Sequence, residues 1–176
     1  MDSTDSFRQQ NPKIMPIKKP ISPENALSRA AMLCSRCEQA EYDIRNKLKS
    51  WGITNSDIEN IINRLISERY LNEERFAIAF TRDKFRFEGW GRIKIAYHLK
   101  CKHVTQHVID AALSEIDENE YIQSLEHILQ VKMRSLKGKE PILAKASLLR
   151  FASSRGFEPN LIYRILPKFV NCDDEY

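Results

Sequence analysis

One arrangement of apolar residues occurs three times along the chain and predicts a helix each time. After a first apolar position, further apolar residues follow at intervals of three, four and seven, which is one face of an α-helix. The sets that share these offsets are Ile58, Ile61, Ile62 and Leu65; Ile109, Ala112, Leu113 and Ile116; and Ile162, Ile165, Leu166 and Phe169. A hydrophobic anchor lies five positions before each set, at Ile53, Val104 and Phe157. We expect each anchor to pack on the helix that follows, much as a hydrophobic staple does.

A second helix is predicted before each anchor. Apolar residues stand nine and five positions upstream, at Ile44 and Leu48, at Ile95 and Leu99, and at Leu148 and Ala152. The N-cap position after the anchor holds Thr54, Thr105 and Glu158. In the turn between the two helices, Gly52 and Gly156 suit a left-handed helix ending, but the middle copy has His103 there. We therefore expect the middle turn to be strained or differently closed.

A third helix precedes each pair, at about 22–36, 72–88 and 118–135, and the first of these starts at Ser22-Pro23-Glu24. A three-helix unit is too small to be comfortably stable alone, so neighbouring units should pack together. The sequence thus predicts an all-α protein of three tandem three-helix repeats in an elongated, curved array; a single irregular bundle is the alternative. The expected segments are a disordered lead-in (1–21), repeat 1 (22–71), a basic repeat 2 (72–117), repeat 3 (118–170) and an acidic tail (171–176).

Composition agrees with a helical protein and restricts its function only loosely. Of 176 residues, 42% are hydrophobic, 30% are charged and only five are glycine, which disfavours a glycine-punctuated sheet protein. The net charge of +4 permits contact with nucleic acid but is also ordinary for a soluble protein. No apolar run approaches the length of a membrane span, and the N-terminus lacks the pattern of a signal peptide. We expect a cytoplasmic protein without a membrane partner.

Candidate chemistry is sparse. Cys34 and Cys37 form a CxxC without a second ligand pair, so they are interpreted as reduced helix cysteines. His98, His103 and His107 lack an acidic partner, and a structural or exposed role is expected for them. The sequence has no phosphate-binding glycine loop, HExxH or G-x-S-x-G motif. We predict no enzymatic activity, no cofactor, no metal and no small-molecule substrate.

The middle copy carries the candidate binding residues. Helical spacing places Arg75, Arg82 and Arg86 on one stripe, and a second stripe of Phe76, Phe80 and Phe87 is expected to pack. On the next helix, Lys94, His98 and Lys102 form a second basic stripe at intervals of four. Such basic stripes either neutralise phosphates or are simply solvated faces. Trp90, between two glycines, either packs in the interior or stacks on a base. The full candidate set is Arg75, Arg82, Lys84, Arg86, Trp90, Arg92, Lys94, His98, Lys100 and Lys102.

Three segments together resemble the RecX family of recombinase regulators. They are Tyr70-Leu71-Asn72-Glu73-Glu74-Arg75-Phe76-Ala77, Gly91-Arg92-x-x-Ile95-x-x-x-Leu99, and the Arg155-Gly156-Phe157 turn before the Ile162 helix; the resemblance runs from about Ala26 to Leu166. Arg69 and His103 stand where the family usually has glycine, and Trp90 stands in a linker that often carries proline.

The resemblance implies a fold of tandem three-helix repeats and a partner. RecX proteins associate with RecA filaments on DNA, lie along the filament groove and typically restrain ATP hydrolysis, strand exchange and co-protease action. We therefore expect binding to the RecA filament, weak non-specific binding to single- and double-stranded DNA, and a monomeric protein. The alternatives are a helix-turn-helix-like DNA-binding regulator that acts without RecA, and a scaffold that binds only protein.

Overall fold

The computed structural model describes residues 21–170, and this part of the chain is helical without a strand. Its helices are α1 (Pro23–Arg36), α2 (Glu41–Ser50), α3 (Asn55–Ser67), α4 (Glu73–Arg86), α5 (Arg92–Cys101), α6 (Gln106–Ser114), α7 (Glu118–Arg134), α8 (Pro141–Arg155) and α9 (Pro159–Ile165), followed by the 3₁₀ turn η1 (Leu166–Lys168). The all-α prediction is confirmed. The predicted acidic tail, and the lead-in up to residue 20, lie outside the described residues.

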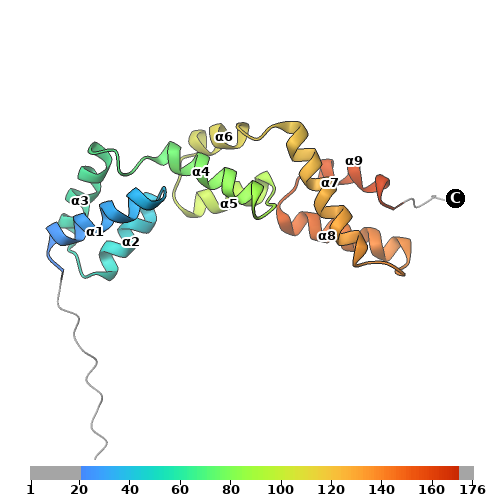
Figure 1. Cartoon of the computed structure of the whole chain (residues 1–176), viewed down its shortest axis with the longest axis horizontal. Coiled ribbons are helices and arrows are strands. Elements are labelled where there is room, and N and C mark those ends of the chain that lie inside the picture. The colour runs from blue at the N-terminus through green and yellow to red at the C-terminus, as the bar shows by residue number, and fades with distance from the viewer. Residues whose placement is uncertain (1–20, 171–176) are drawn as a thin grey trace, which may run out of the picture.

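The helices follow one another in three sets along a curved, elongated array, as predicted (Figure 1). The close helix packing falls within α1–α3, within α4–α6 and within α7–η1. We call these sets the first, second and third units. The residue limits predicted for the repeats stay a prediction, since packing of helices does not fix where a unit begins and ends.

The predicted apolar pattern forms the interior of each unit. The anchors Ile53, Val104 and Phe157 are buried, and so are the six apolar residues predicted upstream of them. In the downstream sets, only Leu113 and Phe169 are partly exposed. The predicted N-caps begin the helices: Thr54 accepts a hydrogen bond from the Asp57 backbone N–H, for example. Periodicity in the sequence therefore identified the buried faces.

The turns between paired helices close in the same way in all three units. Gly52, His103 and Gly156 have φ angles of 81°, 62° and 85°. In each, the N–H of the following anchor donates to the carbonyl five residues earlier, as Val104 does to Leu99 at 3.2 Å. The expected strain at His103 is confirmed, because a left-handed backbone costs a non-glycine residue about 1 kcal/mol. The middle turn closes like the other two, so strain is the one of the two predicted alternatives that is found.

One predicted packing residue is exposed. On α4 the buried residues are Phe76, Ala77, Thr81 and Phe85. Phe87 was expected to pack with Phe76, but its exposed fraction is 83%. Phe87 follows the last residue of α4 as its C-cap and lies beyond Phe85, the last buried residue of the helix.

The first and second units meet mainly through side chains. Arg75 on α4 pairs with Glu38, with Nε and Oε1 2.8 Å apart, and Lys102 after α5 pairs with Asp43 on α2, with Nζ and Oδ1 2.7 Å apart. The first unit has a hydrophobic core of its own, whereas a single core runs through the second and third units and reaches back only to Ala40. We call this contact region the first junction.

The second and third units meet through backbone atoms, in what we call the second junction. At the start of α5, Gly91 N–H donates to the Arg155 carbonyl at 2.8 Å, and Ile93 N–H donates to the Gly156 carbonyl at 3.1 Å. The end of α8 thus supplies the acceptors that the first turn of α5 lacks. The approach is so close that a Cβ on Gly91 would lie 2.2 Å from the Gly156 oxygen. Gly91 is needed for this contact because no other residue leaves room for it.

A buried tyrosine completes the second junction. The Tyr121 hydroxyl accepts a hydrogen bond from Arg92 N–H at 2.9 Å and donates one to Glu158 at 2.7 Å. Burial, together with the neighbouring Glu158 carboxylate, raises the pKa of Tyr121, while the Arg92 N–H opposes that rise. The hydroxyl therefore stays protonated and serves both as donor and as acceptor.

Candidate nucleic-acid interface

Four of the predicted site residues converge around one aromatic ring. Trp90 lies in the loop between α4 and α5, with the Lys84 Nζ 5.1 Å and the Lys94 Nζ 4.6 Å from its ring centroid. The His98 ring centroid is 4.6 Å from that of Trp90, one turn along α5 from Lys94. We call Lys84, Trp90, Lys94 and His98 the Trp90 cluster. Trp90 packs against the core of the second unit and is neither fully buried nor fully exposed.

The charge of this cluster comes from its lysines. Partial burial lowers the pKa of His98 below its usual value, and the nearby Lys94, Lys84 and Lys102 lower it further. The imidazole is therefore neutral at neutral pH. Two ammonium groups beside a partly exposed indole can contact a phosphate and a base together, because cations neutralise the backbone and every base has a face that stacks.

Three other predicted site residues hold the units together. Arg75 and Lys102 form the two ion pairs of the first junction. Arg92 pairs with Glu118 at 3.0 Å, donates to the Ile116 carbonyl and lies over the Tyr121 ring. Sequence spacing identified these cations, but their acidic partners are 26 to 59 residues away in the chain and could not be assigned from the pattern.

The remaining predicted cations lie apart from the Trp90 cluster. Arg82, Arg86 and Lys100 are exposed, and Arg86 approaches Glu120 at 3.9 Å. Among the described residues, no hydrogen bond, ion pair or ring contact joins these three to Trp90. Arg82, Arg86 and Lys100 are therefore not members of the Trp90 cluster.

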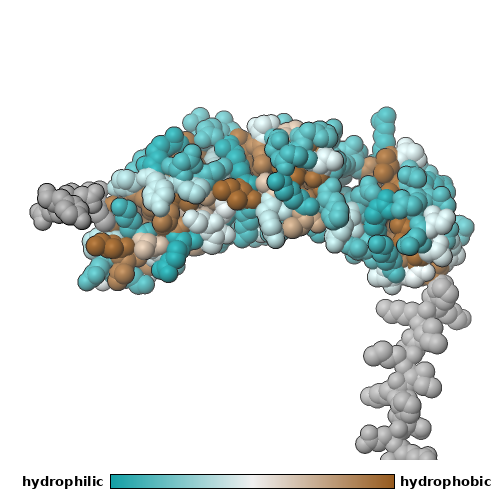
Figure 2. Space-filling view, turned by 180° about the vertical axis from the view of Figure 1, so that it is seen from behind, coloured by the Kyte–Doolittle hydropathy of each residue, from teal (hydrophilic) through white to brown (hydrophobic). Residues whose placement is uncertain are grey.

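The sequence interpretation missed the charge of the third unit. Residues 72–117 carry eight basic and seven acidic residues, whereas residues 118–170 carry nine and five. The excess positive charge thus lies in the third unit. Its free tip also shows apolar surface (Figure 2), where Ile142 is 74% and Leu143 57% exposed. A count of charge per predicted repeat would have found this signal.

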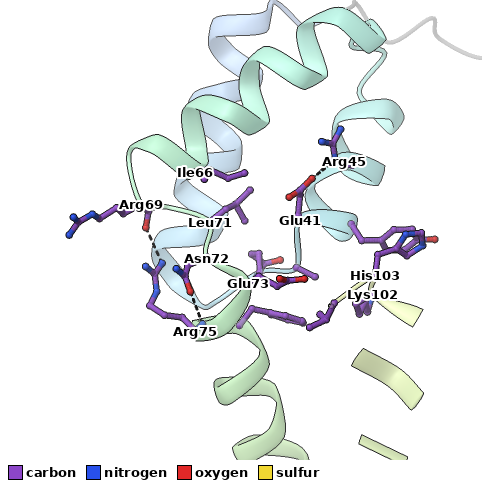
Figure 3. Close-up of a pocket in the computed structure, with 15 residues that line it drawn as sticks. Glu41, Arg45, Ile66, Arg69, Leu71, Asn72, Glu73, Arg75, Lys102 and His103 are labelled. Carbon is purple, nitrogen blue, oxygen red and sulfur yellow. Dashed lines mark hydrogen bonds and ion pairs between the residues drawn. The ribbon is translucent and has the colours of Figure 1, made fainter. Parts of the chain in front are cut away.

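A groove of about 590 Å³ lies at the first junction. Side chains of both signs surround it, with Glu41 and Arg45 from α2, Glu73 from α4 and Lys102 beyond α5 (Figure 3). On one side the Tyr42 and His103 rings are stacked with centroids 4.7 Å apart. Because the lining charges are mixed, the groove does not select an anion or a cation by charge alone.

The cysteines and histidines do not converge on a metal site. Within residues 21–170, no group of three or more side chains of the metal-binding types is found. Burial raises the pKa of Cys34 to about 11, with smaller effects of Glu38 and Cys37 in the same direction. Cys34 lies in α1 and is a thiol at neutral pH. Cys37 is exposed and follows the end of α1, so its interpretation as a helix cysteine is wrong. Cys172 lies outside the described residues.

Known proteins resemble this chain in sequence and in fold. A family model described as the second three-helix domain of RecX matches residues 72–113. The regulatory protein RecX of Prosthecochloris aestuarii is 32% identical over 145 residues, which cover 82% of this chain and 93% of that protein. The chain belongs to the RecX family. Its members are named as regulatory proteins, and that of Clostridium botulinum is 29% identical over 77% of this chain.

Coverage and fold add two facts about this RecX-family chain. It spans 64% of the length of the Clostridium botulinum relative, so that protein is longer than the matched region. The crystal structure of RecX from Lactobacillus salivarius matches with a TM-score of 0.73 at 17% identity, over 84% of this chain and 96% of that one. This match supports the helical array.

In the part of the chain with defined placement, no helix is both long and apolar enough to cross a membrane.

Proposed function

We propose that this protein binds the RecA recombinase filament on DNA and modulates its activities, with inhibition of ATP hydrolysis, strand exchange and co-protease action as the expected direction. Membership of the RecX family carries the proposal. An elongated array supports it, because separate units can contact neighbouring filament subunits, and several modest contacts made by one molecule add up to high avidity. The protein would then act by binding and not by catalysis.

The Trp90 cluster is the proposed DNA-facing site on the second unit. Lys84 and Lys94 would contact phosphates, and Trp90 would stack on a base or bury itself against the partner. Arg82, Arg86 and Lys100 are proposed as further contacts from the exposed faces of α4 and α5. Arg75, Arg92 and Lys102 contribute indirectly, by fixing the angle between units.

The test is RecA ATP hydrolysis on single-stranded DNA with increasing amounts of this protein. The wild-type protein should lower the rate, and the variant Lys84→Glu/Lys94→Glu should need at least about tenfold more protein for the same effect, since each lost phosphate contact weakens binding. The matched control is Lys47→Glu/Lys49→Glu, which reverses two exposed charges on α2 in the first unit. An unchanged ATPase rate with wild-type protein would contradict the proposed function.

A helix-turn-helix-like regulator that acts without RecA is the second candidate. The α5–turn–α6 arrangement favours it, because two short helices around a tight turn resemble the DNA-binding motif. Saturable, sequence-specific binding to duplex DNA at moderate salt, together with no effect on RecA, would support this candidate over the first.

A further inference from the structure

We infer that single-stranded nucleic acid follows a strip across the second junction, with Trp90 on the second unit and Phe151 on the third unit as its two stacking platforms. The inference rests on the proposed function as far as DNA binding is concerned. It adds a binding site on the third unit and commits the ligand to a strand with unpaired bases.

Phe151 has the same kind of surroundings as Trp90. It lies on α8 and is partly exposed, with the Lys132 Nζ 5.6 Å and the Arg155 Cζ 5.4 Å from its ring centroid. Lys132 comes from the end of α7 and Arg155 from the end of α8. A ring between two cations thus occurs once on each side of the second junction. Such a combination of aromatic and basic groups is typical of surfaces that bind single strands.

Side-chain contacts connect the two platforms. Lys94, which lies over Trp90, donates to the Ser154 carbonyl at 3.3 Å, and Arg155, beside Phe151, donates to the Glu88 carbonyl at 2.6 Å. Each cation therefore belongs to one platform and touches the unit that carries the other. Because the two units share one core, the platforms are held at a fixed separation. The protein therefore does not have to rearrange when a strand binds, and less binding free energy is lost.

The local charge suits a polyanion. Between residues 132 and 155 the chain has seven basic residues and one acidic residue. Within the described part of the chain, none of these seven cations takes part in an ion pair. By contrast, five of the eight basic residues of the second unit take part in ion pairs, and four of these pairs join it to another unit. The uncompensated charge of the third unit is free to neutralise phosphates.

The aromatic platforms distinguish a single strand from the other polyanions. In duplex DNA the base faces are covered by their neighbours, so Trp90 and Phe151 would add little to the phosphate contacts. An acidic protein surface would use the cations but has no series of flat rings to stack. The pairing of rings with cations therefore favours unpaired bases.

The test is direct binding of a labelled thymidine oligonucleotide of 15 bases and of a duplex of the same length, followed by fluorescence anisotropy without RecA. Phe151→Leu keeps an apolar side chain and removes the ring. It should weaken single-strand binding about tenfold, in the range of one lost stacked base, and change duplex binding less than about twofold. Lys132→Gln should weaken binding of both the single strand and the duplex. It should also lower the slope of log affinity against log salt concentration by about the contribution of one phosphate contact.

Matched controls separate the ring and the charge from general effects. Tyr163→Leu removes a ring that is 58% exposed elsewhere on the third unit, and Lys47→Gln removes an exposed cation of the first unit. Both should bind like wild type. Helicity and the melting midpoint of all variants are compared, so that a loss of binding is assigned to Phe151 only where the fold is kept.

Two results would overturn the inference. One is single-strand binding by Phe151→Leu equal to that of wild type, and the other is an equal loss on single strand and duplex. If Phe151→Leu weakened only the effect on RecA, this face would bind protein and the inference would also fall. Because the binding assay contains no RecA, a strip confirmed in it would stand even if the ATPase test contradicted the proposed function.

Discussion

The two junctions join similar three-helix units by different kinds of contact. At the first junction, two partly exposed ion pairs and a ring stack border a groove, and the first unit keeps its own core. At the second junction, backbone groups of α5 and α8 bond to each other, Tyr121 is buried between them, and one core crosses the boundary. A repeated helical pattern therefore says little about how rigidly its copies are joined.

The energies of these contacts also indicate that the second junction is the more rigid one. Partly exposed ion pairs contribute at most about 1 kcal/mol each and are weakened by salt. Hydrogen bonds between buried groups contribute about 1 kcal/mol each, and leaving one partner unsatisfied costs about 1–3 kcal/mol. The second and third units should thus unfold together, whereas the first unit can change its angle without loss of its core.

The largest effect is expected from Gly91→Ala. The added methyl group would lie 2.2 Å from the Gly156 oxygen and 2.5 Å from the Phe157 nitrogen, so α5 and α8 must separate. We expect a loss of about 3 kcal/mol in the free energy of unfolding, from overpacking and broken backbone hydrogen bonds. Urea denaturation followed by circular dichroism measures it. Gly52→Ala, with nothing within 4 Å of its Cβ but a φ of 81°, should cost only about 1 kcal/mol.

Tyr121→Phe should break the second junction less severely. It removes the hydroxyl that bonds to Arg92 and Glu158, and leaves both partners inside the junction without their hydrogen bond. The expected loss in unfolding free energy is about 2 kcal/mol. Tyr163→Phe, on an exposed side chain, is the control and should change stability by less than about 0.5 kcal/mol. Equal stability of the two variants would contradict a structural role for the Tyr121 hydroxyl.

The difference between the junctions also explains what the sequence could predict. The helices and their buried faces follow from local periodicity, so the positions of Ile44, Ile95 and Leu148 were correctly assigned. Trp90 and its lysines are close in sequence, and their grouping was within reach of helical spacing. The pairing of Lys102 with Asp43, or of Gly91 with Gly156, depends on contacts between distant segments, which no local pattern contains.

His103→Gly should raise the stability of the protein and at the same time loosen the first junction. Glycine relieves the left-handed backbone, so the unfolding free energy should rise by about 1 kcal/mol. The same change removes the ring that stacks on Tyr42, and the first unit should then move more freely. Spin labels on α3 and α5, in a variant without the native cysteines, would report a broader distance distribution.

Arg69→Gly is the matched control for this change. Arg69 also has a φ of 62°, but it contributes its carbonyl, not its side chain, to the hydrogen bond with Arg75. Its replacement should raise stability by a similar amount and leave the distance distribution unchanged. A narrower or unchanged distribution in His103→Gly would argue against a role of the ring stack in the first junction.

The smallest effect on stability is expected from the ion pairs of the first junction. Glu38→Gln/Asp43→Asn should lower the unfolding free energy by less than about 1 kcal/mol, because both pairs are partly exposed. It should still broaden the α3–α5 distances, as should salt raised from 50 to 500 mM in the wild type. Labels on α6 and α9, across the second junction, should not respond to either change. Equal broadening at both junctions would show that they do not differ in rigidity.

Because the second and third units share one core, they can rotate together as one rigid body about the groove at the first junction. A small rotation about the first junction would carry the α7–α8 tip through a much larger arc, because the tip is the most distant part of the described array (Figure 1). The separation between the two ends of the molecule is then governed by one angle, and by the few side chains that hold that angle.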